Sequence, residues 1–197
     1  AIPGVIGTIN YRFSGQTLDA PVTTPESLDL MRILRKMADG GVTDVIMEVS
    51  SHALRQGRVR GCPFHVGVFT NISRDHLDYH NSMEDYFEAK SLLFRGFGEK
   101  ETDHLKWAII NTDDPKGEEL IQLTGANVAT YGLGKNCNVR AEGIQLTTSG
   151  MTASLVTPAG KIGIRSSLIG DFNIYNILAA SAAALCLGID LDGVASG

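Results

Sequence analysis

The chain has 197 residues, of which 43% are hydrophobic and 20% are charged, and its formal net charge is −5. This length and hydrophobic content suffice for one sizeable core with a smaller satellite sheet. The acidic balance and the absence of Lys/Arg clusters exclude nucleic acid as the expected partner. No apolar run approaches the roughly 20 residues of a membrane span, so no membrane association is expected. The three cysteines are odd in number and scattered, which is typical of reduced thiols in a cytoplasm.

The first part of the chain alternates between expected helices and strands. Thr24 as N-cap and Pro25 at the first helical position predict a helix that runs to about Asp39, where Gly40 and Gly41 would end it. The expected strands share short apolar runs and lie at residues 45–49, 66–70, 107–111 and 127–131. Strands that alternate with helices in this way indicate a mostly parallel sheet.

The chain beyond Gly134 predicts a small antiparallel β-meander within residues 136–169. Its expected strands alternate apolar and polar residues and lie at 139–146, 151–157 and 161–169. An alanine-rich helix is expected from about Asn173 to Leu187. The predicted fold class is therefore α/β, with a mostly parallel central sheet flanked by helices and the attached meander.

Polar residues follow the expected strand at 66–70, in the string TNISRDHLDYH (70–80). In open α/β sheets ligands bind beyond the carboxyl ends of strands, although a polar loop that caps the next helix explains such a string equally simply. Ser82 is the expected N-cap of that helix, and Lys90 falls in its apolar stripe. A buried lysine favours the neutral amine, which carbon dioxide can carbamylate into an anionic metal ligand; the alternative is a lysine that extends to the surface.

A second acidic residue stands at the end of the expected strand 45–49. Glu48 is costly there if buried, unless it is paired or metal-bound, and unremarkable if the strand is an edge strand that faces water. Together with His76 and Lys90 it forms a set that hard-cation chemistry could use.

Several strings together resemble the central domain of the Mur ligases, the ATP-dependent amino-acid ligases of peptidoglycan synthesis. They are EVSSHALRQGRV (48–59), FTNISRDHLDYH (69–80), the helix that reaches Lys90, NTDDP (111–115) and GDFNIYNILAA (170–180). Within the family, the chain is most similar to the ligases that add the third residue of the stem peptide. The resemblance spans residues 1–197, and it implies a P-loop-NTPase-like fold and a bacterial, cytoplasmic protein.

The resemblance also implies roles for individual residues. Glu48 and His76 correspond to magnesium-associated residues of the family, and Lys90 corresponds to its carbamylated lysine. The residues that correspond to contacts with the UDP-MurNAc-dipeptide substrate are Thr23, Thr24, Ser50, Gln56 and Arg58. Asn71, Asn173 and Asn176 correspond to residues of the nucleotide region. The implied cofactors are ATP and Mg²⁺, and the second substrate is a diamino acid, meso-diaminopimelate or L-lysine.

The phosphate loop of the family is missing, since no G-x-x-x-x-G-K-[ST] string occurs in the chain. We expect a chain that lacks the phosphate loop and the flanking domains of the family to be inactive alone. It is also expected to self-associate through apolar sheet surface that the missing parts would cover. Two alternatives remain, namely a folylpolyglutamate synthetase-like ligase and a non-catalytic binding module of the same fold.

Overall fold

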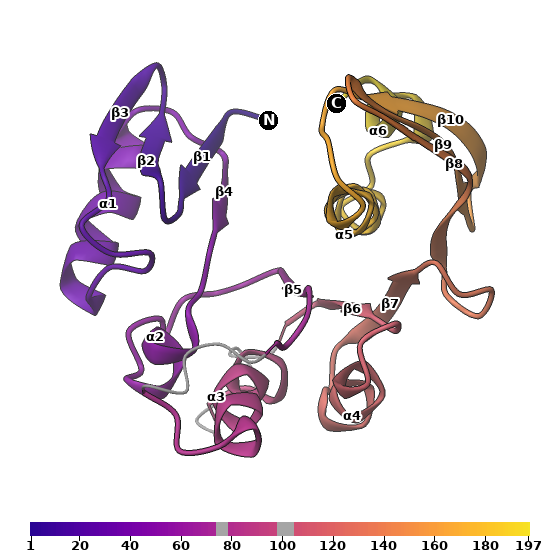
Figure 1. Cartoon of the computed structure of the whole chain (residues 1–197). Coiled ribbons are helices and arrows are strands. Elements are labelled where there is room, and N and C mark those ends of the chain that lie inside the picture. The colour runs from indigo at the N-terminus through magenta and orange to yellow at the C-terminus, as the bar shows by residue number, and fades with distance from the viewer. Residues whose placement is uncertain (74–78, 98–104) are drawn as a thin grey trace. The chain divides into compact units, whose positions relative to one another are not determined.

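A computed structural model of the chain describes residues 1–73, 79–97 and 105–197 (Figure 1). The described chain forms two compact units. Unit 1 comprises residues 1–62 together with 79–93, and unit 2 comprises residues 63–73, 94–97 and 105–197. Each unit is described by itself below.

Unit 1 contains a four-stranded sheet in the order β3-β2-β1-β4. The strands are β1 (Pro3–Ile6), β2 (Asn10–Phe13), β3 (Gln16–Asp19) and β4 (Asp44–Met47). β1 is antiparallel to β2 and parallel to β4, so the carboxyl ends of β1 and β4 meet at one edge of the sheet. Ser14 and Gly15 both have positive φ, 46° and 76°, which suits the tight hairpin turn between β2 and β3.

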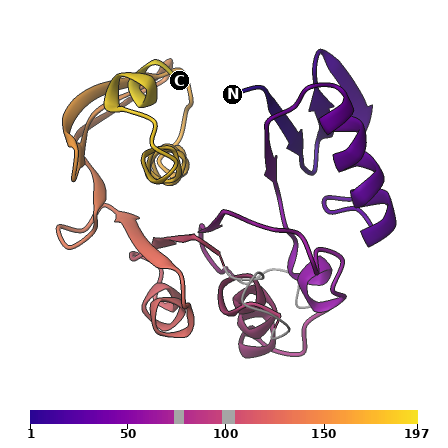
Figure 2. The same ribbon diagram turned by 180° about the vertical axis from the view of Figure 1, so that it is seen from behind.

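Helix α1 (Ser27–Asp39) packs against this sheet (Figure 2). Its fully buried residues are Leu30 and Met37, and a Cβ at Gly4 of β1 would lie only 2.8 Å from the Met37 sulfur, so a larger residue there would require the Met37 side chain to shift. The prediction that Thr24 caps this helix is wrong, because the N-cap is Glu26, with extended backbone and no side-chain cap. The Thr24 hydroxyl instead bonds to Glu48 O and to the Ser50 amide.

Two further helices complete unit 1, α2 (Ser51–Arg55) and α3 (Met83–Arg95), whose last two residues fall in unit 2. The predicted cap of α3 is confirmed, since the Asp85 amide donates to the Ser82 hydroxyl at 3.1 Å. Tyr86 and Phe87 are buried as the apolar stripe predicts, whereas Lys90 is half-buried.

Unit 2 contains a six-stranded sheet in the order β10-β9-β8-β7-β6-β5. Its strands are β5 (Val66–Phe69), β6 (Trp107–Asn111), β7 (Asn127–Gly132), β8 (Val139–Thr147), β9 (Gly150–Thr157) and β10 (Gly160–Ser166). The pairs from β5 to β8 are parallel and those from β8 to β10 are antiparallel, which confirms the predicted α/β class and the meander. The meander continues the parallel sheet, because β8 pairs with both β7 and β9.

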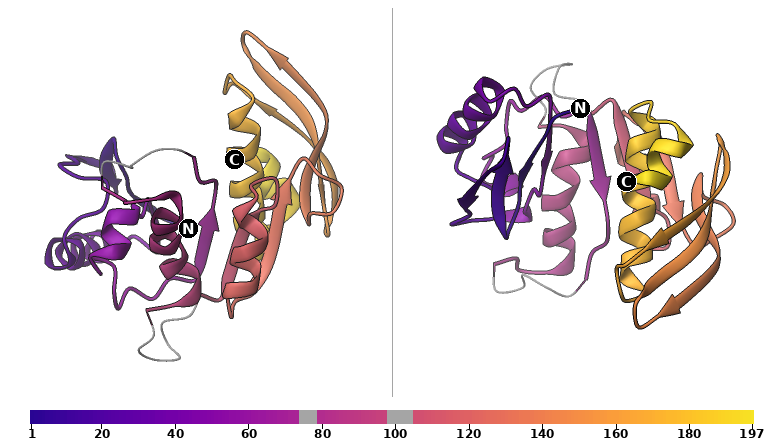
Figure 3. Two further views of the ribbon diagram at one scale, coloured as in Figure 1. Left: turned by 60° about the horizontal axis from the view of Figure 1, so that its bottom comes forward. Right: turned by 90° about the horizontal axis from the view of Figure 1, so that it is seen from above.

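Helices cover the sheet of unit 2 (Figures 1 and 3). α5 (Phe172–Cys186) packs on the face from β5 to β8, α4 (Lys116–Leu123) packs on β6, and α6 (Leu191–Ser196) packs on β10. The main core of the unit lies between α5 and the sheet and includes Ile109, Tyr131, Leu155 and Leu178, all fully buried. None of the helices in the described ranges is long and apolar enough to cross a membrane.

Candidate functional site

The carboxyl ends of β1 and β4 bring Glu48 beside Thr8. The Glu48 amide donates to Ile6 O at 2.9 Å, which carries the parallel pairing one residue past β4. One carboxylate oxygen of Glu48 accepts the Thr8 hydroxyl at 2.6 Å and the Thr8 amide at 3.3 Å. The same hydroxyl lies 3.1 Å from that of Thr23. Of the two alternatives for Glu48, the edge strand that faces water is confirmed, because Glu48 is exposed and β4 is an edge strand of its sheet. Thr8 nevertheless orients the carboxylate.

Thr24 joins the end of β4 to the start of α2. Its hydroxyl donates to Glu48 O at 2.9 Å and accepts the Ser50 amide at 3.0 Å, and the residue is only 1% exposed. Ser50 in turn caps α2, because its side chain accepts the Ala53 amide at 3.2 Å. The hydroxyl of Thr24 therefore sets the backbone path between β4 and α2.

Arg58 reaches the same place from the far end of α2. Its guanidinium donates to Thr24 O at 3.0 Å and to Gln56 Oε1 at 2.8 Å, and it pairs with Glu26 at 2.9 Å. The Arg58 side chain is 16% exposed, while that of Glu26 is 65% exposed. The predicted residues Thr23, Thr24, Glu48, Ser50, Gln56 and Arg58 thus form one cluster, which we call the Thr24 hub.

Lys90 lies on α3, with its Nζ 5.0 Å from the centroid of the Tyr86 ring. His76 lies outside the described residues, so the expected bridge between His76 and Lys90 stays a prediction. No group of three or more His, Cys, Asp and Glu residues suited to a metal ion occurs within residues 1–73, 79–97 and 105–197. The oxygen atoms of Glu48, Thr8 and Thr23 are nevertheless the kind of donor that Mg²⁺ prefers.

The predicted nucleotide-region residues belong to unit 2. Asn173 and Asn176 lie in the first turns of α5, where Asn176 Nδ2 donates to Asn173 Oδ1 at 3.0 Å and Asn173 Nδ2 donates to Ile169 O at 2.8 Å. Asn71 is an exposed residue that follows β5 by two positions. The asparagine pair is therefore pre-oriented by its own hydrogen bond.

A pair of aspartates connects the segment of Asn71 to α5. Asp114 accepts the Ile72 amide at 2.8 Å, and Asp113 accepts the Tyr175 hydroxyl at 3.0 Å and the Leu133 amide at 2.6 Å. Burial, and then the hydrogen bond to Asp113, raise the pKa of Tyr175 to about 12. These contacts place the ends of β5, β6 and β7 next to the first turns of α5.

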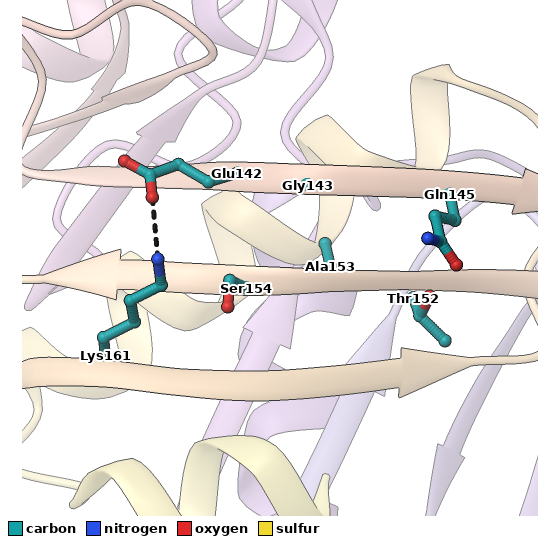
Figure 4. Close-up of a pocket in the computed structure, with 7 residues that line it drawn as sticks. All are labelled: Glu142, Gly143, Gln145, Thr152, Ala153, Ser154 and Lys161. Carbon is teal, nitrogen blue, oxygen red and sulfur yellow. Dashed lines mark hydrogen bonds and ion pairs between the residues drawn. The ribbon is translucent and has the colours of Figure 1, made fainter.

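A shallow cavity of about 380 Å³ lies on the meander (Figure 4). Its lining consists of Glu142, Gly143, Gln145, Thr152, Ala153, Ser154 and Lys161. The Glu142 carboxylate accepts Lys161 Nζ at 2.8 Å and Arg140 Nη2 at 3.0 Å, so its charge is offset within the sheet. None of the predicted site residues lines the cavity, and we assign it no function.

Sequence reasoning missed two residues that the structure brings to these sites. Thr8 was missed because the short strand before it, Pro3–Ile6, carries too little pattern to be recognised. His80 was given no role, although it is 1% exposed and contacts both α2 and α3. Its position directly after DHLDY was the only available signal.

Comparisons with known proteins agree on one family. The profile described as Mur ligase middle domain matches residues 2–184. The UDP-N-acetylmuramoyl-L-alanyl-D-glutamate–2,6-diaminopimelate ligase of Geobacter metallireducens is 51% identical over 194 residues, which cover 98% of this chain and 38% of that protein. The ligase of the same name from Geobacillus kaustophilus is 46% identical over 194 residues, which cover 98% of this chain and 40% of that protein.

A solved structure of a UDP-N-acetylmuramoyl-L-alanyl-D-glutamate–2,6-diaminopimelate ligase superposes on the chain with a TM-score of 0.88 at 33% identity. The match covers 99% of this chain and 39% of that one. The chain therefore spans about two fifths of the length of the relatives that it matches.

Proposed function

The chain belongs to the Mur ligase family as its middle domain, and on this premise we propose that it is the central domain of an ATP-dependent ligase of peptidoglycan synthesis. The ligase would join a diamino acid to UDP-MurNAc-L-Ala-D-Glu. The names of the relatives favour 2,6-diaminopimelate over L-lysine as that amine. The observation that carries the proposal is the Thr24 hub, which gathers all five residues assigned to the UDP-MurNAc-dipeptide.

The Thr24 hub presents a guanidinium and hydroxyl groups, which can bind the carboxylates and amides of the substrate. Arg58 supplies a largely buried guanidinium whose only ion pair is with the exposed Glu26 in the described structure, so an incoming carboxylate can replace Glu26. The hydroxyls of Thr23 and Ser50 add neutral donors and acceptors beside it. Because Thr24 fixes the backbone under these groups, they are held in place before the substrate binds.

The reaction proposed for the longer ligase has two steps. The D-glutamyl carboxylate attacks the γ-phosphorus of ATP and releases ADP, and the amine then attacks the acyl phosphate, releasing phosphate and a proton. Mg²⁺ would offset the charge of the phosphoryl group when bound, and Glu48, His76 and carbamylated Lys90 are the residues proposed to hold it. The Lys90 carbamate forms when the neutral amine adds carbon dioxide and loses a proton. Asn71, Asn173 and Asn176 are proposed to contact the nucleotide through their amide groups.

Two alternatives predict different behaviour. A folylpolyglutamate synthetase-like ligase would add glutamate to a folate, and the identity of about half to relatives named diaminopimelate ligases weighs against it. A non-catalytic binding module would retain the fold without turnover. The ordered hub, which keeps Glu48 beside Thr8, favours an enzyme over such a module.

The decisive experiment uses a ligase of the full length of the relatives that contains this sequence. Release of ADP is measured with UDP-MurNAc-L-Ala-D-Glu, ATP and Mg²⁺, and with meso-diaminopimelate, L-lysine or glutamate as the amine. We expect release only with a diamino acid. No release with either diamino acid would refute the proposal. Calorimetry on the 197-residue chain provides a comparison, because without a phosphate loop it should bind ATP much more weakly than the full-length ligase.

We also propose a cytoplasmic location. All three cysteines lie in the described part of the chain and are free there, as is expected in a reducing compartment. A labelled full-length ligase should fractionate with the cytoplasm of the bacterium that encodes it, and recovery in an extracellular fraction would contradict this.

A further inference from the structure

His80 forms a buried clamp on helix α2. Its Nε2 lies 2.8 Å from the Ser51 hydroxyl, and its Nδ1 lies 3.3 Å from Asp85 Oδ2. Asp85 also pairs with Arg55. Ser51 and Arg55 are the first and last residues of α2, so the clamp holds this short helix at both ends.

The helix that is clamped carries two substrate residues of the Thr24 hub. Ser50 is the N-cap of α2 and Gln56 is its C-cap, and Gln56 accepts the guanidinium of Arg58. A five-residue helix has little intrinsic stability, so its position depends on tertiary contacts. The spacing between Ser50 and Arg58 therefore depends on what holds Ser51 and Arg55.

The clamp also reaches the side of α3 that carries Lys90. The His80 ring stacks on that of Tyr86, with centroids 5.0 Å apart and planes 22° apart. Lys90 Nζ lies 5.0 Å from the centroid of the same Tyr86 ring. His80 thus connects the substrate side of unit 1 to the environment of Lys90.

The order of contacts, Ser51 to His80 to Asp85, matches that of a hydrolase triad, but its burial excludes that role. Ser51 is 2% exposed and His80 is 1% exposed, so no acyl group could reach the hydroxyl. We propose instead that His80 is a positioning residue, which fixes α2 so that Ser50, Gln56 and Arg58 meet the UDP-MurNAc-dipeptide together. This inference rests on the ligase function proposed above.

The test compares steady-state kinetics of variants of the full-length ligase. His80→Phe keeps a ring on Tyr86 but removes the hydrogen bonds to Ser51 and Asp85, whereas His80→Gln keeps an amide about as far from the backbone as Nε2, within reach of Ser51. We expect His80→Phe to raise KM for the UDP-MurNAc-dipeptide about tenfold and to change KM for ATP less than twofold. We expect KM for the dipeptide in His80→Gln to be close to that of the wild type. In the double variant, Ser51→Ala should raise this KM little beyond the value for His80→Phe alone.

Leu30→Ala is the matched control, because Leu30 is fully buried in α1 of the same unit and does not belong to the hub. It should lower Tm and the amount of active enzyme but leave both KM values unchanged. A folded His80→Phe with unchanged KM for the dipeptide, or with both KM values raised equally, would overturn the clamp. If His80→Phe does not fold, Ser51→Ala is judged by the same criteria. An inactive wild-type ligase would refute the proposed function. An active ligase in which the His80 substitution leaves KM for the UDP-MurNAc-dipeptide unchanged would refute only the positioning role of His80.

Discussion

Replacing Thr24 by valine tests whether a single hydroxyl organises the site. Valine has nearly the shape of threonine and no hydroxyl, so it leaves Glu48 O and the Ser50 amide without the partner that they have now. Each buried backbone group left unpaired costs about 1–3 kcal/mol, and access of water at the exposed Glu48 reduces the total. We therefore expect Thr24→Val to destabilise unit 1 by about 2–4 kcal/mol.

Thr24→Ser is the matched control, because it keeps the hydroxyl and removes one methyl group. Since Thr24 is 1% exposed, the lost methyl costs about 1 kcal/mol. Both variants are compared with wild type by hydrogen exchange of the Ala53 and Leu54 amides, which bond within the first turn of α2. A cost of about 2–4 kcal/mol should speed their exchange roughly 30- to 700-fold in Thr24→Val, where exchange follows local opening.

Amides of β6 in unit 2 serve as the internal reference and should exchange at the wild-type rate in both variants. The reasoning fails if exchange in Thr24→Val stays within threefold of wild type. It also fails if Thr24→Ser is as perturbed as Thr24→Val, since packing of the methyl group, not the hydroxyl, would then account for the effect.

Three further predictions concern Lys90, Tyr175 and β4. If the Lys90 carbamate is a magnesium ligand, ligase assays should show Lys90→Ala partly restored by acetate and Lys90→Arg inactive; a near-normal Arg variant would end the carbamate proposal. The Tyr175 pKa is raised from 10.0 to about 12, so its contribution to stability is complete below pH 10.0 and is lost as the pH rises through about 12. Phenolate absorbance should therefore show a step near pH 12 that Tyr175→Phe removes, and persistence of that step would contradict the assignment. On the edge strand β4, Val45 is 41% exposed and Ile46 is 57% exposed. Sedimentation should therefore show that the 197-residue chain self-associates and that Val45→Lys weakens this association. A monomeric wild-type chain would contradict the prediction.

Periodicity predicted the long elements well and the short ones poorly. α5 begins one residue before the predicted Asn173 and ends one before Leu187, and the four apolar runs all form strands. The hairpin of β2 and β3 was not predicted, because four-residue strands show too few alternations to separate from loops. The turn at Ser14 and Gly15 was the signal that could have revealed it.

The error at Thr24 has a physical cause. A threonine before a proline is a good N-cap because its hydroxyl accepts backbone amides, and the same ability lets it accept the Ser50 amide from another segment. Local sequence does not choose between these partners, since the choice depends on where β4 ends. The grouping of Thr24 with Ser50 and Arg58 came from the resemblance to a family, because spacing alone does not bring residues 24, 50 and 58 together.

The two candidate regions are each stabilised within their own unit, and this makes their roles separable. The hydrogen bonds of the Thr24 hub lie entirely within residues 8–58, whereas Asn176 bonds to Asn173 inside unit 2. We therefore expect that loss of one network leaves the other intact. In the full-length ligase, Arg58→Ala should raise KM for the UDP-MurNAc-dipeptide with little change in KM for ATP, and Asn176→Ala should do the reverse. If each substitution raised both KM values alike, binding of the two substrates would depend on a shared structure, and the assignment of the hub to one substrate and the asparagines to the other would be wrong.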